Sequence, residues 1–487
     1  IGYERHWGKN LDQEFTLLYN ALLFNNGIPI EYTDHPGFFT ILGLSLFLKF
    51  ISFFNFVPVH KLSLLNSENF NSSFKELIIF TRIYGAVWVS LFCTASYIFF
   101  NRFSKHKFYS LILTLLVFFS QGTIFHIAQL RTELVAMFFI ILSLICLKTF
   151  SEDKTKYRIF KLSGFFIFMI FALLNKMQIF FLIPLFLAVI YFSENKFYDF
   201  DVSEIKFLNN KWVPYFLIII ILFYIYISNH TQHPFPILSA LAVILNIILI
   251  NFFFFFVIKK YSKKIKINLI VINLTFILSF FLVKNLLSIH PSANEIIFLN
   301  LTRIMHIAQH VTTDSNIFTN KLDLALYLAQ QFYVNFINVV IQIITKLDYF
   351  TILLISNLFI MIIFRKFLTL EMIKFNIVCL VVSILLMVIN SFRMEGIVPT
   401  YYKIFSDLII VLSFCNFSKI LKMKFLSIIL ILTFTLNFKP NYVYLKSQKI
   451  NDQKEIINHV CNSNYLKDWH KKIKPEYYKK FCENNIL

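Results

Sequence analysis

The stretch that decides the fold is residues 132–150, TELVAMFFIILSLICLKTF, which carries charge only at Glu133 and Lys148, close to its two ends. A helix needs about 20 mainly apolar residues to cross the hydrocarbon core of a bilayer. Similar segments lie near 37–59, 78–100, 108–127, 159–174, 177–193, 211–228, 235–258, 267–289, 349–364, 374–390, 401–416 and 423–437. The sequence therefore predicts an all-α integral membrane protein with about 13 transmembrane helices.

Composition favours the same class of protein. Hydrophobic residues make up 58% of the 487 residues and charged residues 15%, and the mean hydropathy is +0.69. Soluble domains carry about 25% charged residues. Only 9 residues are glycine, and none of them forms a phosphate-cradling loop, so nucleotide-binding folds lose support.

The formal net charge of +20 indicates membrane topology rather than a nucleic-acid partner, because the basic residues fall mostly in short loops between apolar runs. The basic loops are 101–107, 148–161, 259–266, 365–374 and 418–424. We expect these loops to be cytoplasmic, at an inner or plasma membrane. The connections near 128–133, 175–178, 229–234, 290–326 and 391–400 are then expected outside, where we also place the active site.

Three regions follow from this pattern. Residues 1–36 are expected to form a first extracytoplasmic loop, 37–437 a polytopic membrane domain, and 438–487 a small polar tail on the outer side. The chain starts with Ile rather than Met, and we expect a preceding segment, most simply a further transmembrane helix. The run 327–348 is amphipathic, and could lie in the interface, line a cavity or form a fourteenth span.

The predicted topology contains one conflict. Residues 1–36 and 128–133 are both expected outside, yet three apolar segments separate them. Either 37–59 or its neighbour is then bent or interfacial, or two of the segments form one unit.

Residues 1–36 contain the most informative acidic group. Asp12 and Glu14 are separated by one residue, and His35 precedes a Pro-Gly step that opens an apolar helix. Two carboxylates just outside a membrane could provide a general base or hold a divalent cation. The alternative is a solvated amphipathic helix.

Cations interrupt apolar sequence at Arg82 and Lys176, and Arg131 and Glu133 stand at the start of 132–150. Such cations suit phosphate or pyrophosphate groups. A carboxylate at the membrane edge is costly unless it is paired or functional. The alternatives are a local Arg131–Glu133 anchor and snorkelling side chains at Arg82 and Lys176.

Two further groups lie in predicted outer connections. If 299–311 is helical, Arg303, His306 and His310 share one face that could meet a lipid phosphate. The two histidines fall short of the three convergent ligands that a metal needs, so we expect no metal site there. Arg393 precedes Tyr402 at the second of these outer connections.

Cysteines divide into two sets. Four lie within apolar segments and are expected to behave as small hydrophobes, namely Cys93, Cys146, Cys379 and Cys415. Cys461 and Cys482 lie in the polar tail, and on the outer side they are expected to form a disulfide. Two free thiols on a cytoplasmic tail are the alternative.

The order of several short motifs resembles the GT-C superfamily of polytopic glycosyltransferases, closest in character to the protein-mannosyltransferase and aminoarabinose-transferase branch. The motifs are DQE (12–14), YNALLFNNG (19–27), DHPG (34–37), FTRIYGAVW (80–88), AQLRTELVAMFF (128–139) and LNKMQIFFLIP (174–184). The resemblance covers roughly residues 10–180, with SFRMEG (391–396) and YYKIF (401–405) beyond it. The DHPG step has one proline where that branch has a His-Pro-Pro-like step.

The resemblance implies transfer of a sugar from a polyprenyl-phosphate donor to a glycan, lipid or protein acceptor, with no nucleotide and no certain cofactor. Asp12 would be the base, Glu14 the alternate base and Glu133 a second acid. Lys176, Arg303 and Arg393 would hold the leaving phosphate. The full set of expected substrate-binding residues is His35, Arg82, Arg131, Lys176, Arg303, His306, Arg393 and Tyr402.

Two other functions stay open. A lipid or glycan flippase, or another transporter, would carry polar residues at mid-membrane and internal symmetry. An enzyme like the O-antigen polymerases or ligases would place its key Arg and His residues in a large outer loop such as 290–326.

Overall fold

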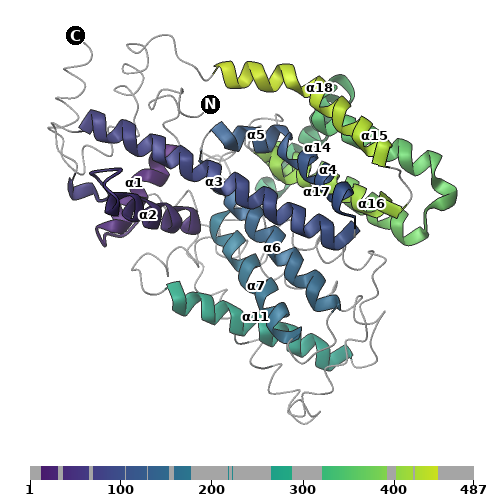
Figure 1. Ribbon diagram of the computed structural model, residues 1–487. Helices are drawn as coiled ribbons and strands as arrows, with labels where there is room; N and C mark the ends of the chain where they lie inside the picture. Colours follow the sequence, from purple (N-terminus) through teal and green to yellow (C-terminus); the bar gives the residue numbers. More distant parts are fainter. Residues whose placement is uncertain are drawn as a thin grey trace.

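A computed structural model describes residues 13–30, 37–64, 70–104, 106–128, 130–152, 158–176, 218, 222, 265–287, 321–391, 402–419 and 423–447. Every regular element in these ranges is helical, which confirms the all-α class (Figure 1). The predicted segments 177–193, 211–228 and 235–258 lie almost entirely outside the described ranges.

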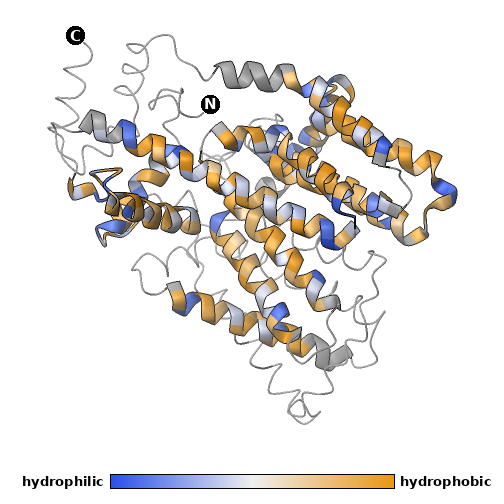
Figure 2. Ribbon diagram, viewed as in Figure 1, coloured by the Kyte–Doolittle hydropathy of each residue, from blue (hydrophilic) through white to orange (hydrophobic). Residues whose placement is uncertain are grey.

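The α-helices are α1 (Gln13–Asn25), α2 (Phe38–Phe53), α3 (Phe70–Ser104), α4 (Lys107–Phe118), α5 (Gln121–Ala128), α6 (Thr132–Glu152), α7 (Arg158–Asn175), α11 (Ile265–Leu287), α14 (Lys321–Thr345), α15 (Tyr349–Ile363), α16 (Leu370–Ser391), α17 (Lys403–Ser413) and α18 (Met423–Ser447). Short 3-10 helices are η2 (Leu62–Leu64), η6 (Arg365–Phe367) and η9 (Phe414–Lys419). Apolar residues run along most of these helices (Figure 2).

Three helices are long and apolar enough to cross a membrane, within Lys75–Ser104, Thr132–Phe150 and Met372–Ser391. Two bent pairs raise this number to five if each pair counts as one span: α4 with α5, bent by 68°, and α14 with α15, bent by 80°. The described residues therefore have membrane-like character, and the number of about 13 spans stays a prediction. Segments 108–127 and 349–364 do form helices, but as parts of the bent pairs.

Helix α6 is the centre of the larger hydrophobic core, and Leu134–Met137 on it are all buried. It packs between α3 and α7. Two tyrosines attach neighbouring helices to this core by hydrogen bonds from their hydroxyl groups to backbone carbonyls. The hydroxyl of Tyr109 donates to Phe414 O at 2.7 Å, and that of Tyr349 donates to Leu116 O at 2.5 Å. These bonds satisfy polar atoms that would be costly to leave unpaired in an apolar interior.

The start of α1 and the connection before α6 lie at the same end of the bundle, because Glu14 accepts a hydrogen bond from the Leu130 N–H. Helix α2 also starts there, with Gly37 against Thr132. Helix α2 has 16 residues, or about 24 Å, which is shorter than the hydrocarbon core. After α2 the chain turns back, and Asn25 Nδ2 donates to both Ser45 O and His60 O. These contacts favour the alternative in which 37–59 is not a separate crossing.

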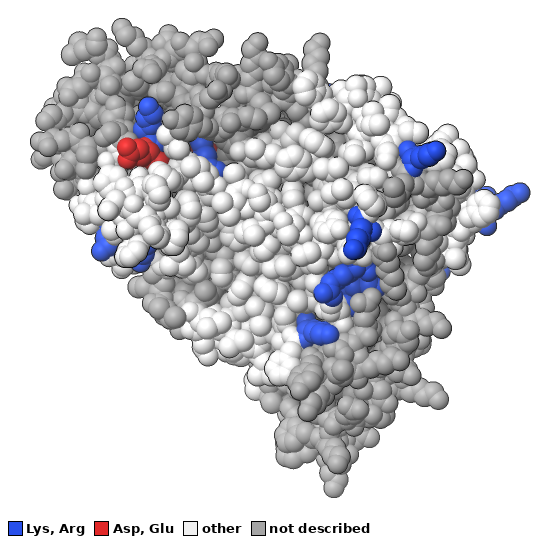
Figure 3. Space-filling view, viewed as in Figure 1, with Lys and Arg blue, Asp and Glu red and all other residues white. Residues whose placement is uncertain are grey.

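Lys148 and Arg102, from two of the predicted cytoplasmic loops, lie at the opposite helix ends from the region of Glu133. Helix α6 begins beside Glu133 and carries Lys148 near its other end, and α3 continues beyond Arg82 to Arg102. Figure 3 shows Lys and Arg side chains near the side where α3 ends and α4 begins, and others on the opposite side of the molecule. The positions of Lys148 and Arg102 agree with the alternation of loop charge.

Candidate functional site

Several helix ends converge at one polar region. Helices α1, α2, α6 and α17 begin there and α7 ends there, while α3 passes through it at Arg82. The N-terminus of a helix carries partial positive charge and favours nearby carboxylates. Glu14 and Glu133 each lie in the first turn of their helix. The sequence therefore places acidic side chains where the backbone stabilises them.

Glu14 is fully buried and forms an ion pair with Arg82. Arg82 Nη2 lies 3.1 Å from Glu14 Oε2, and Arg82 Nε lies 3.3 Å from the same oxygen. The other carboxylate oxygen, Oε1, accepts the Leu130 N–H at 3.3 Å. A buried charge needs a partner and hydrogen bonds to offset its desolvation. Glu14 thus joins α1 to α3 and to the start of α6, and it is not the solvated residue of the alternative interpretation.

Glu133 is the centre of a second buried ion-pair group. Lys176 Nζ lies 2.7 Å from Glu133 Oε1, and Arg131 Nε lies 3.4 Å from Oε2. The Lys176 ammonium also lies 5.1 Å from the centre of the Tyr402 ring, a distance at which a cation is attracted to the ring face. Both cations and Tyr402 are buried. Lys176 therefore points into the protein, and the snorkelling alternative does not describe it.

Asn175 fixes the backbone just before Lys176. Its Oδ1 accepts the Thr40 N–H at 3.1 Å and the Thr40 hydroxyl at 3.0 Å, and its Nδ2 donates to Phe171 O. The start of α2 is thereby attached to the end of α7. This contact sets the direction from which Lys176 reaches Glu133.

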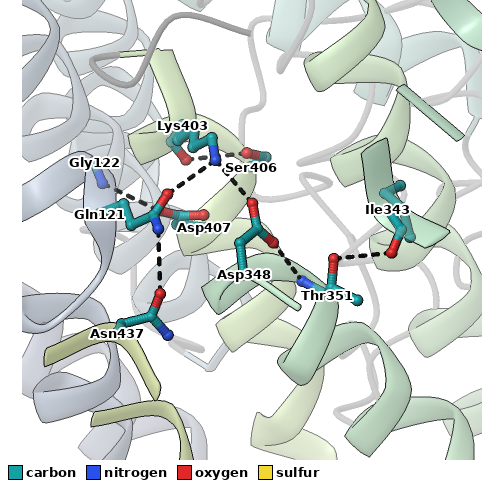
Figure 4. Close-up of polar contacts among 9 residues, drawn as sticks. All are labelled: Gln121, Gly122, Ile343, Asp348, Thr351, Lys403, Ser406, Asp407 and Asn437. Atoms are coloured by element: carbon teal, nitrogen blue, oxygen red, sulfur yellow. Dashed lines mark hydrogen bonds and ion pairs between the residues drawn. The ribbon is translucent and has the colours of Figure 1, made fainter. Parts of the chain in front are cut away.

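A further polar network lies beside this region, around Lys403 (Figure 4). Lys403 Nζ donates to Gln121 Oε1 and to Asp348 Oδ2, each at 2.9 Å. Gln121 Nε2 donates to Asn437 Oδ1 at 3.2 Å, and the Gly122 N–H donates to Asp407 Oδ2 at 3.3 Å. The network connects α5, α15, α17 and α18.

The structure brings six of the predicted site residues to the convergence region: Glu14, Arg82, Arg131, Glu133, Lys176 and Tyr402. The others lie outside the described residues, namely Asp12, His35, Arg303, His306, Arg393, Cys461 and Cys482. Within the ranges that the structure describes, no group of three His, Cys, Asp or Glu side chains could hold a metal ion. Cys93, Cys146, Cys379 and Cys415 are free thiols.

Sequence reasoning missed Asn175, Gln121, Asp348 and Asp407, and it gave Lys403 no role. Asp348 stands directly before the predicted segment 349–364, and Lys403 and Asp407 lie inside the predicted segment 401–416. A charge inside or at the edge of a membrane segment indicates a partner or a function. This signal could have identified these three residues, whereas the amides of Asn175 and Gln121 carry no comparable signal.

Neither a protein-family model, nor a curated protein, nor a solved structure matches this chain, so its function must be inferred from its own residues.

Proposed function

We propose that the chain is an integral membrane glycosyltransferase of the GT-C type, with about 13 spans, that moves a sugar from a polyprenyl-phosphate donor to an acceptor on the extracytoplasmic side. The observation that carries the proposal is the Arg131–Glu133–Lys176 group with Tyr402 beside it. It joins residues that are distant in the sequence and places two cations at one buried position. Buried cations on rigid helix ends suit a phosphate at the end of a lipid.

Glu14–Arg82 supports the same assignment. The start of α1 is held beside the Glu133 group because Glu14 is attached to α3 and to Leu130. Asp12 comes two residues before Glu14 in the sequence, and we assign it the role of general base. Glu14 itself already has Arg82 and an N–H as partners, so it is better suited to orient the segment than to accept a proton.

The reaction then needs three groups. The Asp12 carboxylate takes the proton of the acceptor hydroxyl as its oxygen attacks the anomeric carbon of the sugar. The bond between that carbon and the phosphate oxygen breaks, and the phosphate leaves with the electron pair. Lys176 and Arg131 stabilise the charge that develops on the leaving oxygen. Neither a nucleotide nor a metal is required for this sequence of steps.

Donor binding tests the proposal. The purified protein in detergent should bind a long-chain polyprenyl phosphate, measured by native mass spectrometry, more tightly than phosphatidylglycerol or inorganic phosphate. Lys176→Met should weaken binding of the polyprenyl phosphate by about tenfold or more, as loss of a close charge contact predicts. Lys366→Met, at an exposed lysine of η6, is the matched control and should leave binding unchanged. Equal binding of all three anions, or an unaffected Lys176→Met, would refute the donor assignment.

The bent helix pairs favour one other function, a lipid or glycan flippase. Transporters often build their sites at discontinuous helices, and both bends here adjoin the buried Lys403 network. Proteoliposomes distinguish the two functions. A flippase moves a labelled lipid between leaflets with no chemical change, whereas the enzyme releases free polyprenyl phosphate when a sugar-charged donor and an acceptor are supplied.

A further inference from the structure

Tyr402 and Lys403 are consecutive residues at the start of α17, and each is held by a different polar group. The Tyr402 ring lies against the Lys176 ammonium at 5.1 Å. The Lys403 ammonium donates to Gln121 and Asp348. The first turn of α17 therefore stands between the Glu133 ion-pair group and the Lys403 network.

The partners of Lys403 come from the two helix bends. Gln121 is the first residue of α5, just after the 68° bend from α4. Asp348 is the N-cap of α15, where its side chain accepts the Thr351 N–H at 3.0 Å, just after the 80° bend from α14. A single ammonium group thus bonds to residues at both bends (Figure 4).

The backbones of α5 and α17 leave little room for movement at this point. A Cβ atom at Gly122 would lie 2.3 Å from Ile404 N, so only glycine allows this approach. The Gly122 N–H also donates to Asp407, three residues beyond Ile404. A shift of the first turn of α17 would therefore disturb the start of α5 as well.

Charge explains why Lys403 is central to this arrangement. The side chains of Lys403 and Asp348 are 9% and 14% exposed, so water screens their 2.9 Å ion pair only weakly. Removal of the ammonium leaves the Asp348 carboxylate without its ion-pair partner in this weakly solvated position. A buried charge without its partner is strongly destabilising. The two bends would also lose the contact that Lys403 makes with each of them.

We propose that Lys403 is a positioning residue: its bonds to Gln121 and Asp348 hold Tyr402 against Lys176 and so set the affinity of the Lys176–Glu133 group for a lipid-linked phosphate. The part that concerns phosphate rests on the proposed function. The physical basis is preorganisation, because an ammonium that is already held by an aromatic ring and a carboxylate needs less ordering when an anion binds.

Two measurements on the purified full chain in detergent test this inference. The first is the dissociation constant for a long-chain polyprenyl phosphate. The second, which needs no ligand, is the rate of reductive methylation of Lys176, followed by mass spectrometry. The variants are Lys403→Met, Lys403→Arg, Tyr402→Leu and the exposed control Lys366→Met. Tyr402→Leu leaves the Lys403 ion pair in place and tests the contact with Lys176 on its own. If Lys403→Met fails to fold, Gln121→Leu takes its place, because it removes one bond of Lys403 and keeps the ion pair with Asp348.

We expect Lys403→Met and Tyr402→Leu to weaken lipid binding by about tenfold and to speed methylation of Lys176 severalfold, while Lys403→Arg stays within about threefold of wild type. The inference is overturned if Lys403→Met unfolds more easily but keeps the wild-type affinity for the lipid and the wild-type methylation rate of Lys176. Lys403 would then have a purely structural role. Weakened binding with unchanged methylation overturns it too, because Lys403 then acts by another route.

The two proposals can fail separately. If the wild-type protein binds no polyprenyl phosphate but methylation of Lys176 rises in Lys403→Met and in Tyr402→Leu, the donor assignment is wrong and the positioning of Tyr402 by Lys403 stands. If methylation is unchanged as well, both are wrong.

Discussion

The Nζ atom of Lys176, just past the end of α7, lies 2.7 Å from Oε1 of Glu133 in the first turn of α6. Both side chains are buried, so this pair has little access to water. Desolvation of two charges is costly, and the pair offsets that cost only through close geometry and further contacts. Arg131 and Tyr402 supply these further contacts.

A double-mutant cycle should reveal strong coupling between Glu133 and Lys176. Glu133→Gln and Lys176→Met should each lower the free energy of unfolding by about 3 kcal/mol, because each leaves a buried charge without its main partner. The double variant should lose clearly less than the sum of the two. Denaturant unfolding in detergent micelles, followed by circular dichroism, measures all four proteins. Additive losses would mean that the two side chains do not interact as the 2.7 Å distance indicates.

Asp12 and Glu14 should respond differently to neutralisation. Asp12→Asn should abolish sugar transfer and leave unfolding unchanged, because the proposed general base is lost and a carboxylate in a predicted outer loop contributes little to stability. Glu14→Gln should lower stability by about 2 kcal/mol or more, since Arg82 loses its carboxylate partner inside the protein. Turnover and thermal unfolding are measured on the same preparations. An active Asp12→Asn beside a folded but inactive Glu14→Gln would transfer the role of base to Glu14.

Gly122 and Gly85 both lie in helices, so the effects of replacing each by alanine can be compared directly. A Cβ at Gly122 would lie 2.3 Å from the backbone nitrogen of Ile404, which cannot move aside like a flexible side chain. Gly122→Ala should therefore destabilise the protein by about 2 kcal/mol or more. At Gly85 the nearest atom is Leu130 Cα at 3.5 Å, an ordinary contact. Gly85→Ala should be neutral or stabilise by up to about 1 kcal/mol, since alanine favours a helix. Equal unfolding midpoints for the two variants would contradict the close approach of α5 and α17.

The helices at the long apolar runs could be predicted from the sequence, but the bends could not. The apolar run at 132–150 is enough to specify α6, because a long apolar segment in hydrocarbon must satisfy its own backbone. At the bends, the decisive interactions are local caps. The Ser120 hydroxyl accepts the Thr123 N–H at the start of α5, and Asp348 does the same for Thr351 at α15. Both residues look like ordinary polar interruptions in the sequence, so three alternatives stayed open for 327–348: an interfacial helix, a helix that lines a cavity, or a span.

The residues of the candidate site, like the helices, could be predicted only in part from the sequence. Arg82, Glu133 and Lys176 were identified because charges are rare and costly next to membrane segments. Their partners depend on how α1, α3, α6 and α7 pack together, and no sequence spacing encodes that Glu14 meets Arg82. Asp12 and Arg393, which belong to the proposed glycosyltransferase site, lie outside the described residues. Their roles therefore stay predictions.

Helix α14 should expose its apolar face to lipid. Its polar side chains Gln331, Asn335, Asn338 and Gln342 share one face, and that face is the more buried one. Tyr333 and Ile344 on the other face are 65% and 76% exposed. A helix with its polar side inward and its apolar side outward is stable beside hydrocarbon and unfavourable in water. It continues into α15, whose exposed residues are also apolar.

Nitroxide labels on single cysteines in a variant that lacks the native cysteines can test this orientation in proteoliposomes. Labels at Tyr333, Ile337 and Ile344 should collide readily with oxygen, which concentrates in the bilayer, and weakly with a water-soluble nickel complex. A label at Gln342, on the opposite face, serves as the matched control and should be poorly accessible to both reagents. High accessibility of Tyr333 and Ile344 to the nickel complex would show that water covers this face. Immobile labels that neither reagent reaches would instead show that another protein surface covers it, and either result would rule out lipid as the neighbour of α14.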